Sequence, residues 1–305
     1  MVIQPAPLQP GDVVGIMCPA GFMPLERTDA CVQTLRSWGY EVAIGETLHS
    51  HSTNYFSGND AERASDLQRM LDDDSIRAIL FGRGGYGMSR IIDQLDFSRF
   101  VENPKWIAGY SDITVILAHL YAKYGIASMH SPMAGAFADQ PEDVRFLPSI
   151  RQVFSGLSMS YTAEPIALNQ PGRGEGPLIG GNLALFTHLI GTDSFPDTTG
   201  AILFLEDVGE QLYNIDRMLR QLKRGGHLEK LSGLLFGGFT DCKDTERPFG
   251  QELPEILQAI VQEYNYPICY DFPVSHTPRN YALKYGVNFQ LNVLPDQVIL
   301  QEATV

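Results

Sequence analysis

The stretch KWIAGYSDITVILAHLYAKYG, residues 105–125, decides the fold class. Its first part, 105–110, is the short apolar run of a buried strand, and 112–125 is a longer apolar segment that ends at a glycine, as helices often do. A strand that turns directly into a helix is a building block of α/β proteins. Ser111 stands at that turn, either as a helix cap or as a nucleophile held towards a substrate.

The same alternation of strand and helix extends along the first half of the chain. Strands are predicted at 12–17, 40–45, 76–81, 105–110 and 126–131, and helices at 25–39, 59–73, 88–96 and 112–125. Asn59 or Asp60 is expected to cap the second of these helices. Short strands that alternate with helices predict βαβ units, a parallel sheet and helices on both of its faces. We therefore expect an N-terminal α/β domain over 1–155.

The pattern stops between 156 and 177, where Gly, Pro and Ser are frequent and no helical period exists. This segment is predicted to be a linker. Beyond it, strands are expected at 201–206 and 231–239, helices at 211–225 and 254–264, and a β-hairpin at the C-terminus. Residues 178–305 are thus predicted to form a mixed α/β domain with a β-rich end.

Composition excludes several classes of function. The formal charge of −14 and the pI near 4.8 disfavour nucleic acids and anionic membranes as partners, because their phosphates require basic surfaces. The N-terminal segment lacks the basic and apolar regions of a secretory signal, and no apolar run approaches the roughly 20 residues of a membrane span. The four cysteines contain no CxxC pair. We expect a cytoplasmic protein with reduced thiols.

Ser111 has two interpretations at this stage. Serine is favoured at helix N-caps, and Asp112 beside it could fill the same role. The carboxyl edge of a parallel sheet is also where open α/β proteins bind ligands, and a helix N-terminus there favours an oxyanion. The G-x-S-x-G pattern of α/β-hydrolases is absent, because Ile113 occupies the position of the second glycine.

The segment GRGGYG, residues 82–87, matches the G-x-G-x-x-G pattern of dinucleotide-binding proteins. That pattern normally follows the first strand, whereas here it follows the third, and the acids Asp93 and Asp96 lie on the next predicted helix. A tight turn is one alternative. A loop whose backbone N–H groups face a developing negative charge is another.

Two residues of the second half complete a possible catalytic set. Glu206 ends a predicted strand, where a carboxylate can orient an imidazole, and His276 lies on a loop that leaves an apolar run. Each has a commoner interpretation as a solvated polar residue. No HExxH or H-x-x-x-H spacing predicts a metal. Together, Ser111, the glycine-rich loop, Glu206 and His276 supply the groups of a serine triad for acyl transfer.

These segments resemble the LD-carboxypeptidases, serine peptidases that remove a terminal D-amino acid from an L-centre in murein peptides. The resemblance is carried, in chain order, by GDVVGIMCPAG, AILFGRGGYGMSRIIDQLD, WIAGYSDITVILAHLYAKYGIASMHSPM, LIGGNLALFTHLIGT, LFLEDVGEQLYNIDRMLRQL and SHTPRNYALKYG. It implies that Ser111 is the nucleophile, Glu206 the acid and His276 the base. It also implies oxyanion donors at the backbone N–H groups of Gly85 and Asp112, and no metal or organic cofactor.

The resemblance further implies two domains that share the triad, a homodimer, and a murein tetrapeptide ending in D-Ala as the substrate, in cytoplasmic wall recycling. Ser275, where the family usually has glycine, and Lys284, where it often has proline, flank His276 without replacing it. One alternative is a self-immunity peptidase that cleaves a peptidyl-adenylate antibiotic such as microcin C, which requires an aromatic residue to stack on the base. A more distant alternative is a non-catalytic dinucleotide-binding protein.

Overall fold

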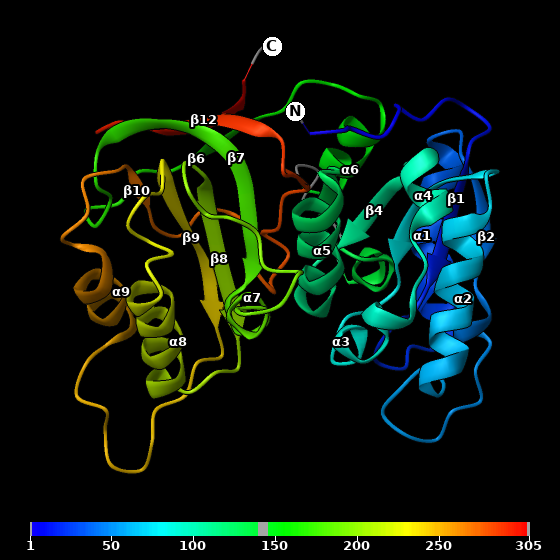
Figure 1. Cartoon of the computed structure of the whole chain (residues 1–305), viewed down its shortest axis with the longest axis horizontal. Helices are drawn as coiled ribbons and strands as arrows, with labels where there is room; N and C mark the ends of the chain where they lie inside the picture. The colour runs from blue at the N-terminus through cyan, green and yellow to red at the C-terminus, as the bar shows by residue number, and fades with distance from the viewer. Residues whose placement is uncertain (1, 140–145, 304–305) are drawn as a thin grey trace. The chain divides into compact units, whose positions relative to one another are not determined.

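The computed structural model describes residues 2–139 and 146–303 of the chain. Contacts divide the chain into two compact units. Unit 1 comprises Met1–Ser158 and Tyr281–Tyr285, and unit 2 comprises Met159–Asn280 and Gly286–Val305. Each unit contains its own sheet, whose elements are labelled in Figure 1. A short piece of the C-terminal half of the sequence therefore belongs to the N-terminal unit.

The sheet of unit 1 has the strand order β11-β5-β4-β3-β1-β2. Its strands are β1 (Val13–Met17), β2 (Glu41–Ile44), β3 (Ile76–Phe81), β4 (Trp106–Gly109), β5 (Ser128–His130) and β11 (Leu283–Tyr285). All neighbours are parallel except β11, which pairs antiparallel with β5. The predicted parallel sheet is confirmed, with β11 as an edge that the sequence did not indicate.

The helices of unit 1 connect these strands. They are α1 (Asp29–Ser37), α2 (Asp60–Asp72), α3 (Met88–Ile91), α4 (Ser98–Glu102), α5 (Thr114–Tyr124) and α6 (Leu147–Phe154), with the 3₁₀ helices η1 (Leu25–Thr28), η2 (Glu46–Leu48), η3 (Ile92–Gln94), η4 (Ser111–Ile113) and η5 (Ala134–Ala138). Asn59 caps α2 as expected, in a capping box with Glu62. Helix α5 is buried through most of its length and ends at Gly125, which adopts the left-handed conformation common after helices.

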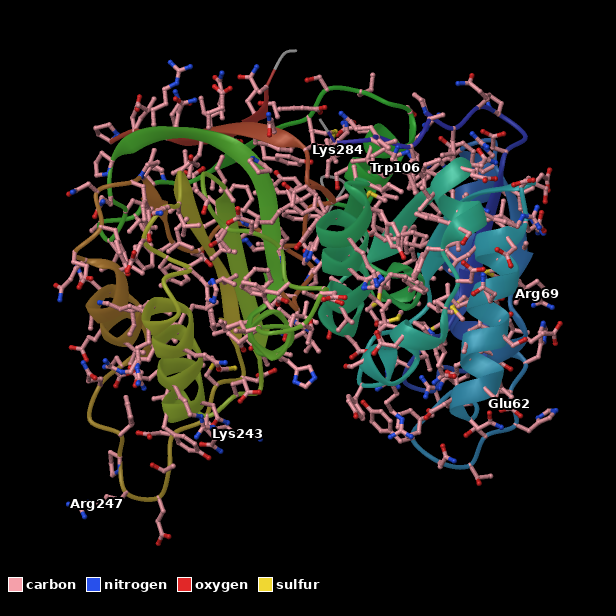
Figure 2. The ribbon with its side chains drawn as sticks, in the orientation of Figure 1. Glu62, Arg69, Trp106, Lys243, Arg247 and Lys284 are labelled. Atoms are coloured by element: carbon pink, nitrogen blue, oxygen red, sulfur yellow. The ribbon has the colours of Figure 1, made fainter. Side chains whose placement is uncertain are left out.

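The strands of unit 1 are apolar because both faces of the sheet are covered. In β3, for example, Ala78, Ile79, Leu80 and Phe81 are all fully buried. Trp106 at the start of β4 is 1% exposed (Figure 2). This continuous burial holds the carboxyl ends of β3 and β4 rigidly, and the segments that follow these ends carry the candidate nucleophile and the glycine-rich loop.

The sheet of unit 2 has the order β10-β9-β8-β7-β12-β13-β6. Its strands are β6 (Ser160–Ala163), β7 (Gly172–Asn182), β8 (Ile202–Val208), β9 (Gly233–Thr240), β10 (Ile268–Cys269), β12 (Asn288–Val293) and β13 (Val298–Glu302), and its helices are α7 (Leu183–His188), α8 (Leu212–Arg224) and α9 (Leu253–Val261). Strands β7 to β10 are parallel, whereas β12, β13 and β6 are antiparallel. The predicted mixed domain with a terminal hairpin is confirmed.

Strand β7 joins the two parts of this sheet, since it pairs antiparallel with β12 and then parallel with β8. Figure 1 shows it as a long, strongly curved strand, with α8 and α9 side by side elsewhere in the unit. Its first half lies in the segment predicted as linker, which also contains β6. Glycine is needed there for close packing, because a Cβ at Gly174 would lie 1.8 Å from the carbonyl oxygen of Ser232. The glycines that suggested a linker therefore belong to a strand.

Among the described residues, no helix is both long enough and apolar enough to span a bilayer.

Candidate active site

Ser111 lies between β4 and α5, at the first residue of η4. Its φ is 63°, a left-handed conformation that is uncommon for residues other than glycine and that is concentrated at functional sites. Within the described part of the chain, no side chain caps η4 or α5. The interpretation of Ser111 or Asp112 as a helix cap is therefore wrong. The turn holds the backbone of Ser111 in a conformation that helix capping does not explain.

The glycine-rich loop, residues 82–87, packs directly against this turn. A Cβ added to Gly84 would lie 3.1 Å from Ser111 Cβ and 3.3 Å from Ser111 Oγ, so any larger residue would crowd the serine. The carbonyl oxygen of Gly84 accepts the N–H of Gly21 at 3.0 Å. Because the described peptide bonds are trans, the N–H of Gly85 points away from Gly21.

Asp112 connects the serine turn to the same loop. Its carboxylate is fully buried, and Oδ2 accepts the backbone N–H of Met88, the first residue of α3, at 2.7 Å. Burial raises the pKa of the Asp112 carboxyl to about 6. A dinucleotide site would need this helix N-terminus for a pyrophosphate. The N–H is already occupied by an acid, and α3 has only four residues, which argues against that hypothesis.

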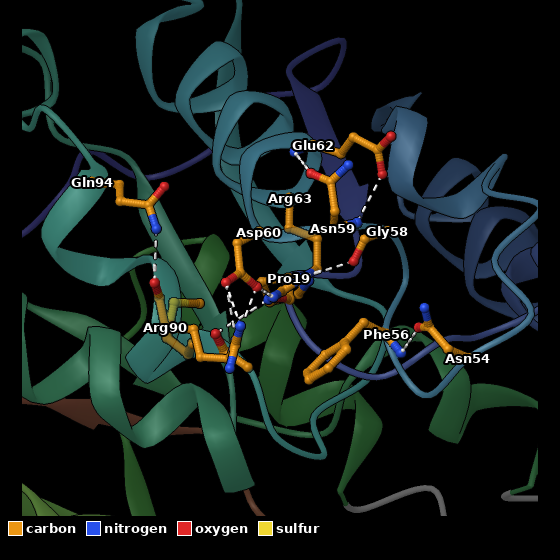
Figure 3. A network of polar contacts seen from close by, with 12 residues as sticks. Pro19, Asn54, Phe56, Gly58, Asn59, Asp60, Glu62, Arg63, Arg90 and Gln94 are labelled. Atoms are coloured by element: carbon orange, nitrogen blue, oxygen red, sulfur yellow. Dashed lines mark hydrogen bonds and ion pairs between the residues drawn. The ribbon is translucent and has the colours of Figure 1, made fainter.

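Arg63 holds the other side of the loop from α2 (Figure 3). Its guanidinium is buried, donates from one nitrogen to the carbonyl oxygens of Pro19 at 2.5 Å and Gly87 at 3.2 Å, and pairs with Asp60. Burial lowers the pKa of Arg63, and the charge of Asp60 opposes this effect. No sequence pattern predicts this role, since arginine on an amphipathic helix is normally solvated.

Unit 2 carries the second part of the predicted set. Glu206 in β8 is fully buried, and its Oε2 lies 2.6 Å from Nδ1 of His276. Burial lowers the pKa of the imidazole, but the hydrogen bond to Glu206 and its charge outweigh burial, so that the pKa of His276 is raised above its ordinary value. A proton held on Nδ1 by the carboxylate leaves Nε2 as the basic nitrogen.

A bulge in β9 allows this pair to form. The register joins Leu205 to Phe236 and Asp207 to Phe239, so Gly237 and Gly238 together oppose the single residue Glu206. A Cβ at Gly237 would lie 2.2 Å from the carbonyl oxygen of Val274 and 3.1 Å from Glu206 Cβ. The two glycines thus let the segment before His276 approach Glu206. Paired glycines inside a predicted strand are a signal for such a bulge.

Asp207 fixes the end of β8 beside Glu206. Its Oδ1 accepts the Asn182 side-chain amide at 2.8 Å, and its Oδ2 accepts the backbone N–H of Ala184 at 3.0 Å. Burial raises the pKa of the Asp207 carboxyl to about 6. Asp207 and Asn182 have no role that the sequence pattern predicts. The pairing of β7 with β8 brings the two together.

Ser275 braces the loop that carries His276. Its Oγ accepts the backbone N–H of Thr277 and donates to the carbonyl oxygen of Arg279, both at 3.1 Å. Lys284, the other departure, belongs to β11 in unit 1, where its Nζ donates to the carbonyl oxygen of Leu157 at 3.0 Å. Figure 2 labels this lysine. The two departures thus lie in different units and have different surroundings.

Metal ligands do not gather in the part of the chain that the structure describes: no three His, Cys, Asp or Glu side chains are arranged to hold an ion. His119 packs against the rings of Phe97 and Tyr124. His130 is fully buried beside Tyr110.

Both units match known families of domains. The family model for the LD-carboxypeptidase N-terminal domain matches residues 14–131, and the model for the C-terminal domain matches residues 175–291. The chain belongs to the LD-carboxypeptidase family. This family consists of peptidases, and the resemblance found in the sequence motifs is confirmed.

Relatives of this LD-carboxypeptidase family member cover nearly its whole length. The probable murein peptide carboxypeptidase of Bacillus subtilis is 34% identical over 98% of this chain and 94% of its own. The microcin C7 self-immunity protein MccF of Escherichia coli is 28% identical over 94% of this chain and 92% of its own length. The crystal structure of muramoyltetrapeptide carboxypeptidase from Oxalobacter formigenes has a TM-score of 0.87 and 28% identity, and the match covers 96% of this chain and 99% of that one.

Proposed function

We propose that this chain is a serine-type LD-carboxypeptidase that hydrolyses the amide between an L-centre and the terminal D-Ala of murein tetrapeptides. The observation that carries the proposal is the contact of the buried Glu206 with the partly buried His276 at 2.6 Å, in a member of the LD-carboxypeptidase family. The relatives named for murein peptides support the substrate class.

In this mechanism Ser111 is the nucleophile. Nε2 of His276 takes the proton of the Ser111 hydroxyl as Oγ attacks the carbonyl carbon, and Glu206 holds the imidazole in the required tautomer and stabilises the imidazolium. The imidazolium then gives its proton to the leaving amine of D-Ala. Water hydrolyses the acyl-enzyme in the second half of the reaction, with His276 again as the base.

The backbone N–H groups of Gly85 and Asp112 stabilise the oxyanion in this proposal. Gly85 is exposed, and its N–H points away from Gly21, because the carbonyl of Gly84 is bonded there. The N–H of Asp112 lies in the first turn that follows β4, where backbone donors lack partners within the helix. One oxyanion donor typically contributes about 3–4 kcal/mol to the transition state.

The test is substitution of the nucleophile. Ser111→Ala is expected to reduce release of D-Ala from murein tetrapeptide by at least about 10⁴-fold, measured by mass spectrometry of the peptide products. Ser98→Ala, which removes an exposed hydroxyl at the start of α4 in the same unit, is the matched control and keeps full activity. Substantial turnover by Ser111→Ala would contradict the proposal, as would failure of the wild-type chain to release D-Ala.

A second candidate is cleavage of a peptidyl-adenylate antibiotic, which the 28% identity to MccF supports. The tryptophans do not offer a base-stacking surface, since Trp106 is 1% exposed and Trp38 packs on Phe137. Tyr86 within the glycine-rich loop and Tyr55 beside it, which are 48% and 53% exposed, offer one instead. Parallel assays of the tetrapeptide and a peptidyl-adenylate decide between the two substrates by their kcat/KM values.

The cellular setting belongs to the same proposal. Recycling of wall peptides takes place in the cytoplasm, and the family resemblance implies a homodimer. Light scattering of the purified chain tests the dimer directly, because it yields the mass of the particle in solution against 33.8 kDa for one chain.

A further inference from the structure

Arg83 lies inside the glycine-rich loop, next to the residue that touches the candidate nucleophile. Gly84 follows it, and the Cβ position of Gly84 lies 3.3 Å from Ser111 Oγ. Consecutive Cα atoms are about 3.8 Å apart, so the backbone of Arg83 is one residue step from the point where the serine would attack. The Arg83 side chain therefore projects from a backbone position close to the candidate nucleophile.

The Arg83 side chain is held in place by a hydrogen bond to a backbone carbonyl group. One terminal nitrogen of its guanidinium donates to the carbonyl oxygen of Phe22 at 2.8 Å, and its stem runs over Gly21, with Nε 3.5 Å from the Cβ position of that glycine. Arginine has five N–H donors, of which this bond uses one. The remaining donors belong to an exposed side chain whose orientation is already set.

Four other arginines of unit 1 each hold a carboxylate. The pairs are Arg27 with Asp139, Arg63 with Asp60, Arg69 with Asp66, and Arg90 with Asp60. Arg83 has no carboxylate within ion-pair distance among the residues that the structure describes. In a chain of net charge −14, an oriented guanidinium without an acidic partner is a receptor for an anion from outside.

We propose that Arg83 binds the C-terminal carboxylate of the substrate, and that this contact makes the enzyme a carboxypeptidase. The inference rests on the proposed function. In a peptide cleaved before its last residue, the terminal carboxylate is only three bonds from the scissile carbonyl carbon, roughly 3–4 Å away. A cation for that carboxylate must therefore come from a segment next to the nucleophile, and Arg83 precedes the glycine that packs on Ser111. The planar fork of arginine matches a carboxylate with two parallel hydrogen bonds.

Binding to the inactive Ser111→Ala chain tests this contact without turnover. The probes are a murein tetrapeptide with a free terminal D-Ala carboxylate and the same peptide with that carboxylate converted to a primary amide, titrated by calorimetry. We expect the acid to bind about 10–100-fold more tightly than the amide. Adding Arg83→Gln should reduce this ratio to near one, mainly by weakening the binding of the peptide with the free carboxylate. Arg83→Lys should give an intermediate ratio.

The control is Arg36→Gln in the same background, because it removes an equally exposed arginine from α1 of the same unit and changes the net charge by the same amount. It should leave the ratio unchanged. If Arg83→Gln weakens the binding of the acid and amide peptides equally, or weakens the binding of neither, the proposal is overturned and Arg83 only positions the loop. If wild-type enzyme releases no D-Ala from the acid peptide, the proposed function itself fails, and this inference with it.

Discussion

Ser111 in unit 1 and Glu206 in unit 2 invite comparison, because each occurs at the carboxyl end of a parallel strand and is followed by a buried aspartate. Asp112 and Asp207 both accept backbone N–H groups from neighbouring segments, and burial raises the pKa of both carboxyls to about 6. The two units thus use the same local device to fix a functional residue. They differ in what is fixed.

In unit 1 the backbone is constrained: Ser111 has a φ of 63°, and glycine packs on it. In unit 2 the side chain is constrained, because Glu206 is fully buried and contacts His276 at 2.6 Å. The difference follows from the chemistry. In the proposed mechanism the Ser111 hydroxyl must be free to reach the substrate, whereas His276 needs its tautomer and charge fixed by a partner.

The largest effect is expected from breaking the partner contact in unit 2. Glu206→Gln should lower kcat/KM by about 10³–10⁴-fold, because the amide no longer fixes the tautomer or stabilises the imidazolium. Glu206 raises the pKa of His276, and the base is active when neutral, so activity is lost as pH falls through that pKa. The variant should therefore retain its residual activity to lower pH. A pH profile of kcat/KM measures both effects.

The control for this change is Glu229→Gln, the same substitution at an exposed acid of unit 2. It should match wild type in rate and profile. An acidic limb that stays at the same pH in Glu206→Gln would show that Glu206 does not set the protonation of His276.

A smaller effect should separate the two kinds of constraint. Gly84→Ala places a methyl group 3.1 Å from Ser111 Cβ, and is expected to lower kcat by about 10–100-fold with little loss of stability. Gly237→Ala places a methyl group 2.2 Å from the carbonyl oxygen of Val274, so the backbone must move. This variant should therefore also lose about 1–3 kcal/mol of unfolding free energy. Urea unfolding and steady-state kinetics of both variants compare them. Equal destabilisation by the two changes would remove the distinction.

The two aspartates differ in how many donors they satisfy, and this predicts unequal effects on stability. Asp207 accepts hydrogen bonds on both oxygens. In Asp207→Asn the new amide NH₂ would face one of the N–H donors, which should lower the free energy of unfolding by about 1–3 kcal/mol. Asp112 receives its hydrogen bond from Met88 on Oδ2, and Asn can accept it equally well. Asp112→Asn should be nearly neutral in urea unfolding near pH 5. A larger loss in Asp112→Asn than in Asp207→Asn would contradict this account.

The last prediction concerns the dependence of stability on pH. The pKa of the Asp112 carboxyl is raised from 3.8 to about 6, so its contribution to stability is greatest below pH 4, where it is protonated in both states, and is lost as pH rises through about 6. Relative to Asp112→Asn, wild type should lose up to about 3 kcal/mol between pH 4 and pH 7. Urea unfolding across this range measures the difference. An identical pH dependence in both proteins would show that Asp112 titrates normally.

Much of the fold was predictable, because it depends on local periodicity. Strand 76–81 was predicted with the bounds that β3 has, and Asn59 with its capping box marks the start of α2. The segment 156–177 was misinterpreted, because the glycines of β7 that permit close packing are indistinguishable in sequence from those of a loop. Strand β11 was not indicated, since three residues that pair with β5 carry no period of their own.

By itself, the sequence determined the order of strands and helices, the family, and the types of residue at Ser111, Glu206 and His276, because these depend on local pattern and on motifs. Only the tertiary structure decided the contact of Glu206 with His276, the bulge at Gly237, the burial of Arg63 and the hydrogen bond of Arg83 to the carbonyl oxygen of Phe22. These features join segments that are distant along the chain, and their energies arise from desolvation and from atoms in direct contact. No local pattern of residues specifies either quantity.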